Sequence, residues 1–228
     1  MLLQPVVTNQ IWCAEHPIRF GPLKISSRAT FVKLLDGSVW VHSPIPITDQ
    51  MASELSQIGE VRYVVAPNLQ HHLYFSECFK AFPTAQGFIA PGLDLKKPAL
   101  RGFQILGAAP ETCWADDFDS VFVDGLPVLN ETAWFHLPTG TLILTDLLFC
   151  FGRSNGLLMT MVARLLGVYD RLGVSRSMKM MVKDKAAFKA SIARIEDWDV
   201  KRIILAHDQI VETDSKRALK GAFAWLEC

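Results

Sequence analysis

Short apolar runs, separated by turn-forming residues, recur along the chain and predict β-strands. Within residues 29–43 (ATFVKLLDGSVWVHS) two such runs flank Asp36-Gly37, the strongest hairpin signal in the sequence. This hairpin is expected to open the domain. Three later runs are predicted as buried strands: 62–66, 141–148 and 202–206.

Other segments repeat their apolar residues at helical spacing. Thr48 can cap a helix that runs to about Ile58, and Asn68 precedes an apolar helical face that would place His71 and His72 in a first helical turn. Three further segments are expected to be helical: 155–172, 183–195 and 215–226.

The middle of the chain carries strand-like pieces whose connections are too short for helices, which predicts an antiparallel arrangement. These pieces are 87–90, 102–106, 120–123 and 131–137. The chain of 228 residues is long enough for one substantial core, so residues 1–228 are expected to form a single α/β domain with helices packed on both faces of mixed, largely antiparallel sheets.

Composition narrows the classes of partner. The 23 basic residues are balanced by 23 acidic ones, so no overall field draws the chain to nucleic acid or to a membrane, and a small molecule or a protein is the expected partner. The five cysteines contain no C-x-x-C pair, and neither a signal peptide nor a membrane-spanning run is expected from the sequence pattern. A cytoplasmic location with reduced thiols is therefore expected.

Polar residues follow three of the predicted strands at their carboxyl ends, where layered α/β folds commonly form a ligand crevice. Asp146 is the only ionisable residue of its apolar run and needs a cation or several hydrogen-bond donors, unless it caps the following turn. His207 ends another strand, and Asp208 could orient its ring or cap the next turn.

The His71-His72 pair has two interpretations. Near a helix N-terminus the dipole disfavours protonation, and a neutral imidazole is what a metal requires. Alternatively, one ring packs against Phe75 while the other forms a local hydrogen bond.

Taken together, these positions resemble the metallo-β-lactamase-like superfamily. The resemblance implies a four-layer αββα sandwich with metals at one edge, and a helical hairpin insertion at about residues 152–195. The family strand that ends in T-H-x-H-x-D-H is similar here to residues 66–72 (APNLQHH), with Pro67 and Leu69 in place of two first-site histidines. The third first-site histidine would be expected near Asn130 or Glu131, and none stands there; His136 lies too late in the sequence.

The ligands of the family's second metal site are matched by four residues: His71, which replaces an aspartate, His72, Asp146 and His207. The resemblance thus implies one divalent metal, zinc or iron, because imidazole and carboxylate ligands suit both. Four protein ligands would fill a tetrahedral zinc, which argues against catalysis unless the metal is five-coordinate or one residue does not bind.

Two functions follow from these observations. The first is a metal-dependent hydrolase with a single metal, with Asp146 as ligand, Asp208 orienting His207, and weaker substrate-binding candidates at Asn68, Glu131 and Arg153. The alternative is a non-catalytic relative that uses the fold for binding or assembly, with a structural metal or none.

The insertion carries two surface features of its own. Residues 176–189 are locally basic, which could grip a phosphate or a membrane, although a solvated helix face is the more common role. Methionines cluster around the same helices, which suits core packing or an adaptable contact. No membrane partner is expected, and a homodimer through this insertion is one expectation.

Overall fold

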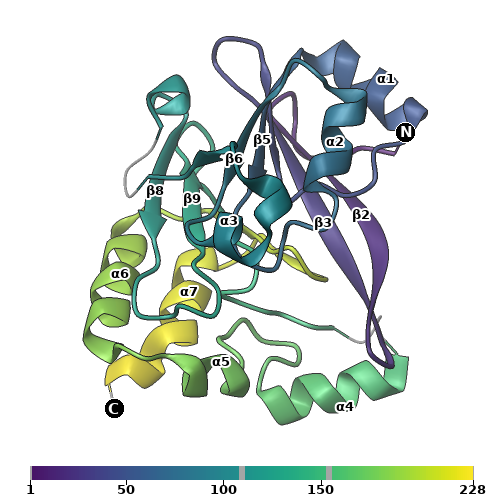
Figure 1. Ribbon diagram of the computed structural model, residues 1–228. Coiled ribbons are helices and arrows are strands. Elements are labelled where there is room, and N and C mark those ends of the chain that lie inside the picture. Colours follow the sequence, from purple (N-terminus) through teal and green to yellow (C-terminus); the bar gives the residue numbers. More distant parts are fainter. Residues whose placement is uncertain (1, 108–110, 153–155, 228) are drawn as a thin grey trace.

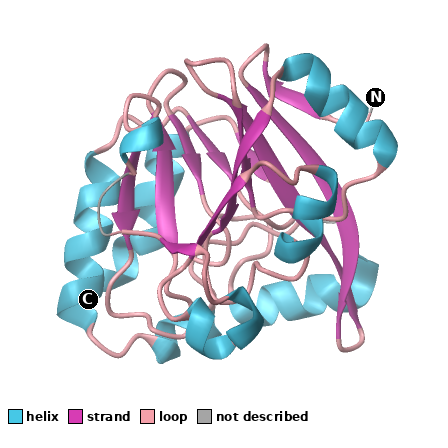
Figure 2. Cartoon of the chain, turned by 45° about the horizontal axis from the view of Figure 1, so that its top comes forward, coloured by secondary structure: helices cyan, strands magenta, loops and turns pink. Residues whose placement is uncertain are grey.

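Two β-sheets pack face to face between helices in a computed structural model that describes residues 2–107, 111–152 and 156–227 (Figures 1 and 2). Over these ranges the first sheet has seven strands in the order β1-β2-β3-β4-β5-β6-β7, and the second has five in the order β12-β11-β10-β9-β8. The strands of the first sheet are β1 (Gln4–Val7), β2 (Ile11–Phe20), β3 (Leu23–Lys33), β4 (Val39–His42), β5 (Val61–Ala66), β6 (Gln86–Ile89) and β7 (Gln104–Ile105). Those of the second are β8 (Phe118–Phe122), β9 (Thr132–His136), β10 (Thr141–Ile143), β11 (Arg202–Ile204) and β12 (Ile210–Val211).

The predicted hairpin at Asp36-Gly37 is confirmed, since β3 and β4 pair antiparallel around it and Gly37 adopts a φ of 84°, which glycine tolerates without strain. The expectation that this hairpin opens the domain was wrong. Strands β1 and β2 precede it, and β2 pairs with β3 along its whole length. The run that forms β2 contains Pro17, which weakens its strand pattern.

The middle of the chain is only partly antiparallel. Strands β4, β5, β6 and β7 pair parallel to one another, which corrects the antiparallel expectation for residues 87–106. The connection between the parallel strands β6 and β7 contains a short helix, α3 (Leu93–Lys96), and a 3-10 turn, η1 (Pro98–Leu100). Strands β8 and β9 pair antiparallel as predicted.

The apolar run from Thr141 forms a shorter strand than predicted. Strand β10 ends at Ile143, between β9 and the parallel strand β11. Leu147 and Leu148 continue the apolar pattern because they are fully buried in the core beneath the second sheet. Asp146 consequently lies just beyond the strand, where the chain leaves the sheet.

Helices cover both outer faces of the pair of sheets. Helices α1 (Asp49–Ile58) and α2 (Phe75–Ala81) lie on the first sheet with α3, while α6 (Lys185–Asp197) and α7 (Ser215–Phe223) lie on the second (Figure 1). Thr48 caps α1 as predicted, accepting a hydrogen bond of 3.2 Å from the Met51 amide. Aromatic side chains fill the space between the sheets: Trp40, Phe88, Trp114, Phe118 and Trp134. This is the predicted αββα sandwich.

Helices α4 (Gly156–Leu166) and α5 (Arg176–Met181) lie along one edge of the molecule, in the segment where the insertion was predicted (Figure 1). The helix predicted over 155–172 ends at Leu166, and Gly167 follows with a φ of 77°. In the described ranges, no helix combines the length and the apolar character that a membrane span requires.

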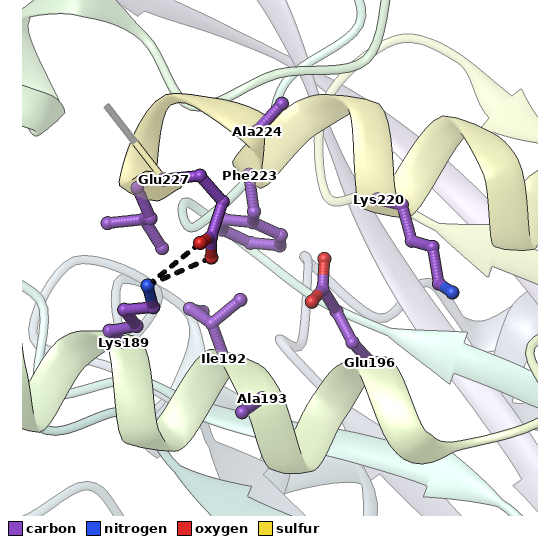
Figure 3. A pocket seen from close by; sticks show the side chains of 9 residues that line it. Lys189, Ile192, Ala193, Glu196, Lys220, Phe223, Ala224 and Glu227 are labelled. Carbon is purple, nitrogen blue, oxygen red and sulfur yellow. Dashed lines mark hydrogen bonds and ion pairs between the residues drawn. The ribbon is translucent and has the colours of Figure 1, made fainter.

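A groove runs between α6 and α7 and the following 3-10 turn, η4 (Ala224–Glu227) (Figure 3). Lys189 of α6 forms an ion pair with Glu227 across it, at 3.0 Å. Ile192 and Phe223 line its floor and belong to the core of this layer. The groove is thus part of the helix packing.

Candidate metal centre

Three side chains with metal-binding atoms converge at one edge of the sandwich. His71 follows β5 of the first sheet, whereas Asp146 and His207 follow β10 and β11 of the second. The Nε2 atoms of His71 and His207 lie 3.2 Å apart, and each is 3.4 Å from an oxygen of the Asp146 carboxylate. The three ligand atoms fall within 4.8 Å of one another. The structure thus brings together three of the four predicted ligands.

The backbone of the first sheet orients His207. Its Nδ1 lies 2.6 Å from the Ser26 carbonyl oxygen, an acceptor only, so Nδ1 carries a proton and Nε2 is the nitrogen that faces the site, bare whenever the ring is neutral. Asp208, which was predicted to orient this ring, instead accepts a hydrogen bond from the Gly152 amide through its carboxylate. The ring of Phe149 stacks parallel to His207, with centroids 6.0 Å apart.

His71 is oriented in a similar way by a side chain. The Ser43 Oγ lies 2.7 Å from its Nδ1. When Ser43 accepts this hydrogen bond, His71 also turns an unprotonated Nε2 toward Asp146. Two such nitrogens facing each other at 3.2 Å repel unless a proton or a metal ion lies between them, so the donor set fits a cation.

The charge of Asp146 is set by these two rings. Burial tends to raise the pKa of this carboxyl, but His71 and His207 together hold it well below its usual range. Burial likewise tends to lower the pKa of His207, and the hydrogen bond and charge of Asp146 outweigh that effect and raise it. The site therefore holds a buried carboxylate that is stabilised by positive charge in front of it.

A buried network behind Asp146 fixes its position. The Asn68 amide nitrogen donates toward the Asp146 carboxylate and the Thr145 hydroxyl, both at 2.9 Å, and toward the Glu131 carboxylate at 3.0 Å. Glu131 in turn accepts from the backbone amides of Thr145 and Asp146, each at 2.8 Å. Burial, and then the charge of Asp146, raise the pKa of Glu131.

Asn68 and Glu131 were weak candidates for substrate binding, but the structure buries both and hydrogen-bonds them to other groups of the protein. They are 0% and 1% exposed, and their polar atoms are bonded to protein atoms. We assign them to the positioning of Asp146. Arg153, the third such candidate, lies outside the described residues.

The predicted helix around the two neighbouring histidines begins later than expected. The Asn68 side chain accepts hydrogen bonds from the amides of Gln70 and His71 at 2.8 and 2.7 Å, as a helix cap would. The helix itself starts only at Phe75, so His71 and His72 lie in the turn before it. Asn68 thereby contacts two ligand segments at once, through its oxygen and its nitrogen.

His72 lies outside the group of ligand atoms. Its side chain is half-buried, and burial followed by the charges of Lys96 and Lys97 lowers its pKa. Adjacent residues point in different directions, which is why only one of the pair faces Asp146. His136 is also outside the group, bonded through Nδ1 to the Thr139 hydroxyl at 2.8 Å.

Two residues near the site were not anticipated. His42 ends β4, stacks on Trp40 and is fully buried, and burial together with the charge of His71 lowers its pKa to about 3. The run V-W-V-H-S shows the same strand-to-polar pattern as the other strands, so the signal was present in the sequence. The buried Arg28 guanidinium donates to the carbonyls of Leu205 and Asp208 and holds the segment that carries His207. No local pattern signals that contact.

Residues 8–159 match the family model described as "Domain of unknown function (DUF4336)". Among curated protein sequences, none matches the chain significantly.

Solved structures share the fold over nearly the whole chain. A metallo-β-lactamase from Pontibacter korlensis superposes with a TM-score of 0.65 at 9% identity, over 99% of this chain and 98% of its own. A variant flavo di-iron protein from Thermotoga maritima gives a TM-score of 0.66 at 14% identity, over 98% of this chain and 61% of its own. A diflavin flavoprotein fragment from Nostoc sp. PCC 7120 gives 0.67 at 12%, over 99% and 96%. The fold is therefore metallo-β-lactamase-like.

Proposed function

We propose that this chain, which belongs to the DUF4336 family, is a metal-dependent hydrolase with one metal ion held by His71, Asp146 and His207. The observation that carries the proposal is the convergence of two imidazole Nε2 atoms and one carboxylate within 4.8 Å. Neighbours named for a metallo-β-lactamase and for a di-iron protein share the fold, which supports metal chemistry at this edge.

The number of ligands favours a catalytic centre. A catalytic zinc usually has three protein ligands and an open position, whereas a structural zinc has four. With His72 outside the group, the described part of the chain supplies three, and the objection raised by a four-ligand set no longer applies. Two histidines and one carboxylate also match the set that binds ferrous iron, so zinc and iron are both candidates.

Each residue of the site has a distinct task in this proposal. His71 and His207 present their Nε2 atoms, because Ser43 and Ser26 hold the other ring nitrogens. Asn68 and Glu131 fix the carboxylate of Asp146. A divalent metal bound there would lower the pKa of a coordinated water toward neutrality and polarise the oxygen of an ester, thioester, lactone or phosphodiester.

The experiment is a hydrolysis screen with purified protein loaded with zinc, manganese or ferrous iron. Asp146→Asn removes one ligand charge with little change in shape, and His72→Gln changes the neighbouring histidine that lies outside the group. We expect metal-dependent turnover on one substrate class, at background level in Asp146→Asn and retained in His72→Gln. Absence of metal-dependent turnover across the panel would contradict the proposal.

One observation supports the alternative, a non-catalytic protein that uses the site for structure. Pro67 and Leu69 stand where the related family has two first-site histidines, and Asn68 and Glu131 are hydrogen-bonded to each other beside them. In that case the metal would bind and stabilise the fold, but no substrate in the panel would turn over. The same hydrolysis screen, combined with a measurement of metal content, distinguishes a hydrolase from a non-catalytic protein with a structural metal.

A further inference from the structure

Helix α4 turns an apolar face outward. Leu157, Leu158, Met161 and Leu165 are 79%, 50%, 60% and 69% exposed. Their spacing places them on one side of the helix, because residues three and four apart lie above one another. A contiguous apolar strip of this kind, on one helix, is unusual for a surface in contact with water only.

The opposite side of α4 anchors the helix to the domain. Met159 and Ala163 are buried against Phe151 and Val168, and Leu23 and Ile25 of the long hairpin pack on the same cluster. In Figure 1 the end of the β2–β3 hairpin reaches α4. The exposed strip therefore belongs to a helix whose other face is already packed against the domain.

The segment that carries this strip is rich in basic side chains. Residues 156–181 contain four basic residues and one acidic residue, Asp170, although the chain as a whole is balanced at 23 and 23. The basic residues are Arg164, Arg171, Arg176 and Lys179. Burial, and then the charges of Arg171 and Arg176, lower the pKa of Lys179, whose ammonium lies over the Trp225 ring, 5.1 Å from its centroid.

The basic group is joined directly to the helix. The Arg176 guanidinium donates to the Leu165 carbonyl at 3.0 Å, which places the start of α5 at the end of α4. Arg164 lies over the Tyr169 ring, 4.6 Å from its centroid. At the hairpin, Arg19 and Lys24 are exposed and paired in register. The apolar strip thus has positive charge beside it on more than one element.

We propose that the α4 face binds the surface of a lipid bilayer that contains anionic lipids. Leucine and methionine side chains would enter the boundary between headgroups and acyl chains, while the arginines and lysines meet the negative headgroups. A helix of 11 residues spans only about 16 Å, so it would lie in the plane of the interface rather than cross it. This proposal differs from the expectation, based on the balanced overall charge, that the chain has no membrane partner.

Charge also argues against a second copy of this chain as the partner that covers the α4 face. A twofold dimer through α4 brings the same patch of both subunits together, which would set arginines against arginines. An anionic surface meets the same residues with opposite charge. The homodimer expected through the insertion is thus the less favourable occupant.

The test is cosedimentation of the full chain with vesicles of phosphatidylcholine alone and of phosphatidylcholine mixed with phosphatidylserine. The double variant Leu157→Ser/Leu165→Ser changes the two most exposed residues of the apolar strip. Leu35→Ser/Leu95→Ser is the matched control, because these leucines are 70% and 73% exposed and lie on other elements. Arg164→Gln/Arg171→Gln tests the charges, and thermal melts verify that every variant folds.

We expect wild type and the control to bind the anionic vesicles, with little binding to phosphatidylcholine alone. Affinity should fall about tenfold or more in the α4 leucine variant and in the arginine variant. Equal binding by wild type and the leucine variant, or no binding by wild type, would overturn the proposal. So would a dimer in light scattering that the leucine variant dissociates while neither protein binds vesicles, since a second copy would then occupy the face.

Discussion

His71 and His207 are 136 positions apart in the sequence, and their Nε2 atoms lie 3.2 Å from each other. One follows a strand of the first sheet and the other a strand of the second, and the carboxylate of Asp146 lies 3.4 Å from each ring. A metal ion on these atoms would join the two halves of the sandwich at their common edge. Metal binding is therefore coupled to folding, because the unfolded chain has no such site.

The first prediction concerns this coupling. Zinc at about 100 times its dissociation constant should raise the free energy of unfolding of the apo protein by about 2.7 kcal/mol. Asp146→Ala should lose this gain, and His72→Ala should keep it. Differential scanning calorimetry of the apo and metal-loaded proteins measures both. An equal gain in wild type and Asp146→Ala would show that the metal binds elsewhere.

Ser43 is predicted to tune the affinity for the metal. Ser43→Ala removes the partner of the His71 Nδ1, so the ring loses its fixed orientation and the affinity should fall about 10- to 100-fold. Competition titration with a chromophoric chelator measures the change. Ser56→Ala, on the exposed side of α1, is the control and should bind metal like wild type. Unchanged affinity in Ser43→Ala would remove Ser43 from the site.

Asn68 is predicted to be important for stability in the absence of metal. Asn68→Ala removes the buried amide that donates to the carboxylates of both Glu131 and Asp146, which should cost about 3 kcal/mol. Asn130→Gly is the matched control, since it loses a single hydrogen bond to the Pro91 carbonyl and glycine accepts the φ of 45°; about 1 kcal/mol is expected. Urea unfolding of the apo proteins compares the two. Similar losses in both variants would contradict a special role for Asn68.

His136 is predicted to make stability depend on pH. Burial lowers its pKa in the folded protein from 6.5 to about 4. Between pH 6.5 and pH 4 the unfolded chain binds more protons at this residue than the folded protein does. The contribution of His136 to the free energy of unfolding is therefore fully present above pH 6.5 and is lost as the pH falls. At pH 5 this loss is about 2 kcal/mol. Urea unfolding at pH 7 and pH 5 should show that His136→Gln loses about 2 kcal/mol less than wild type. An identical loss in both proteins would refute this assignment.

Much of the fold could be predicted from local patterns. The Asp36-Gly37 hairpin, the Thr48 cap and the strand at 202–206 are signalled by neighbouring residues, and each is present in the structure. The length of the strand after Thr141 could not be predicted. Leu147 and Leu148 continue the apolar pattern after the strand has ended, because they are buried in a core covered by helices. Hydrophobicity alone does not distinguish buried residues of a strand from buried residues of the loop that follows it.

The ligands of the candidate site were more accessible to sequence analysis than their supports. Asp146 and His207 stand at the ends of strongly apolar runs, where an ionisable side chain is conspicuous. The contact between Asn68 and Glu131 joins residues 63 positions apart, and Ser26 acts through a backbone carbonyl that any residue could supply. Such contacts depend on the tertiary fold. The choice of His71 over His72 depends on the turn before α2, because this helix begins only at Phe75 and not directly after Asn68 as the pattern predicts.

The most direct test of the central claim is the metal content of untagged protein purified without chelator, measured by inductively coupled plasma mass spectrometry beside Asp146→Ala, His71→Ala and His72→Ala. We expect about one zinc or iron per chain in wild type and His72→Ala, and little in the other two variants. No metal in wild type, two metals per chain, or loss of metal in His72→Ala with retention in His71→Ala would contradict it.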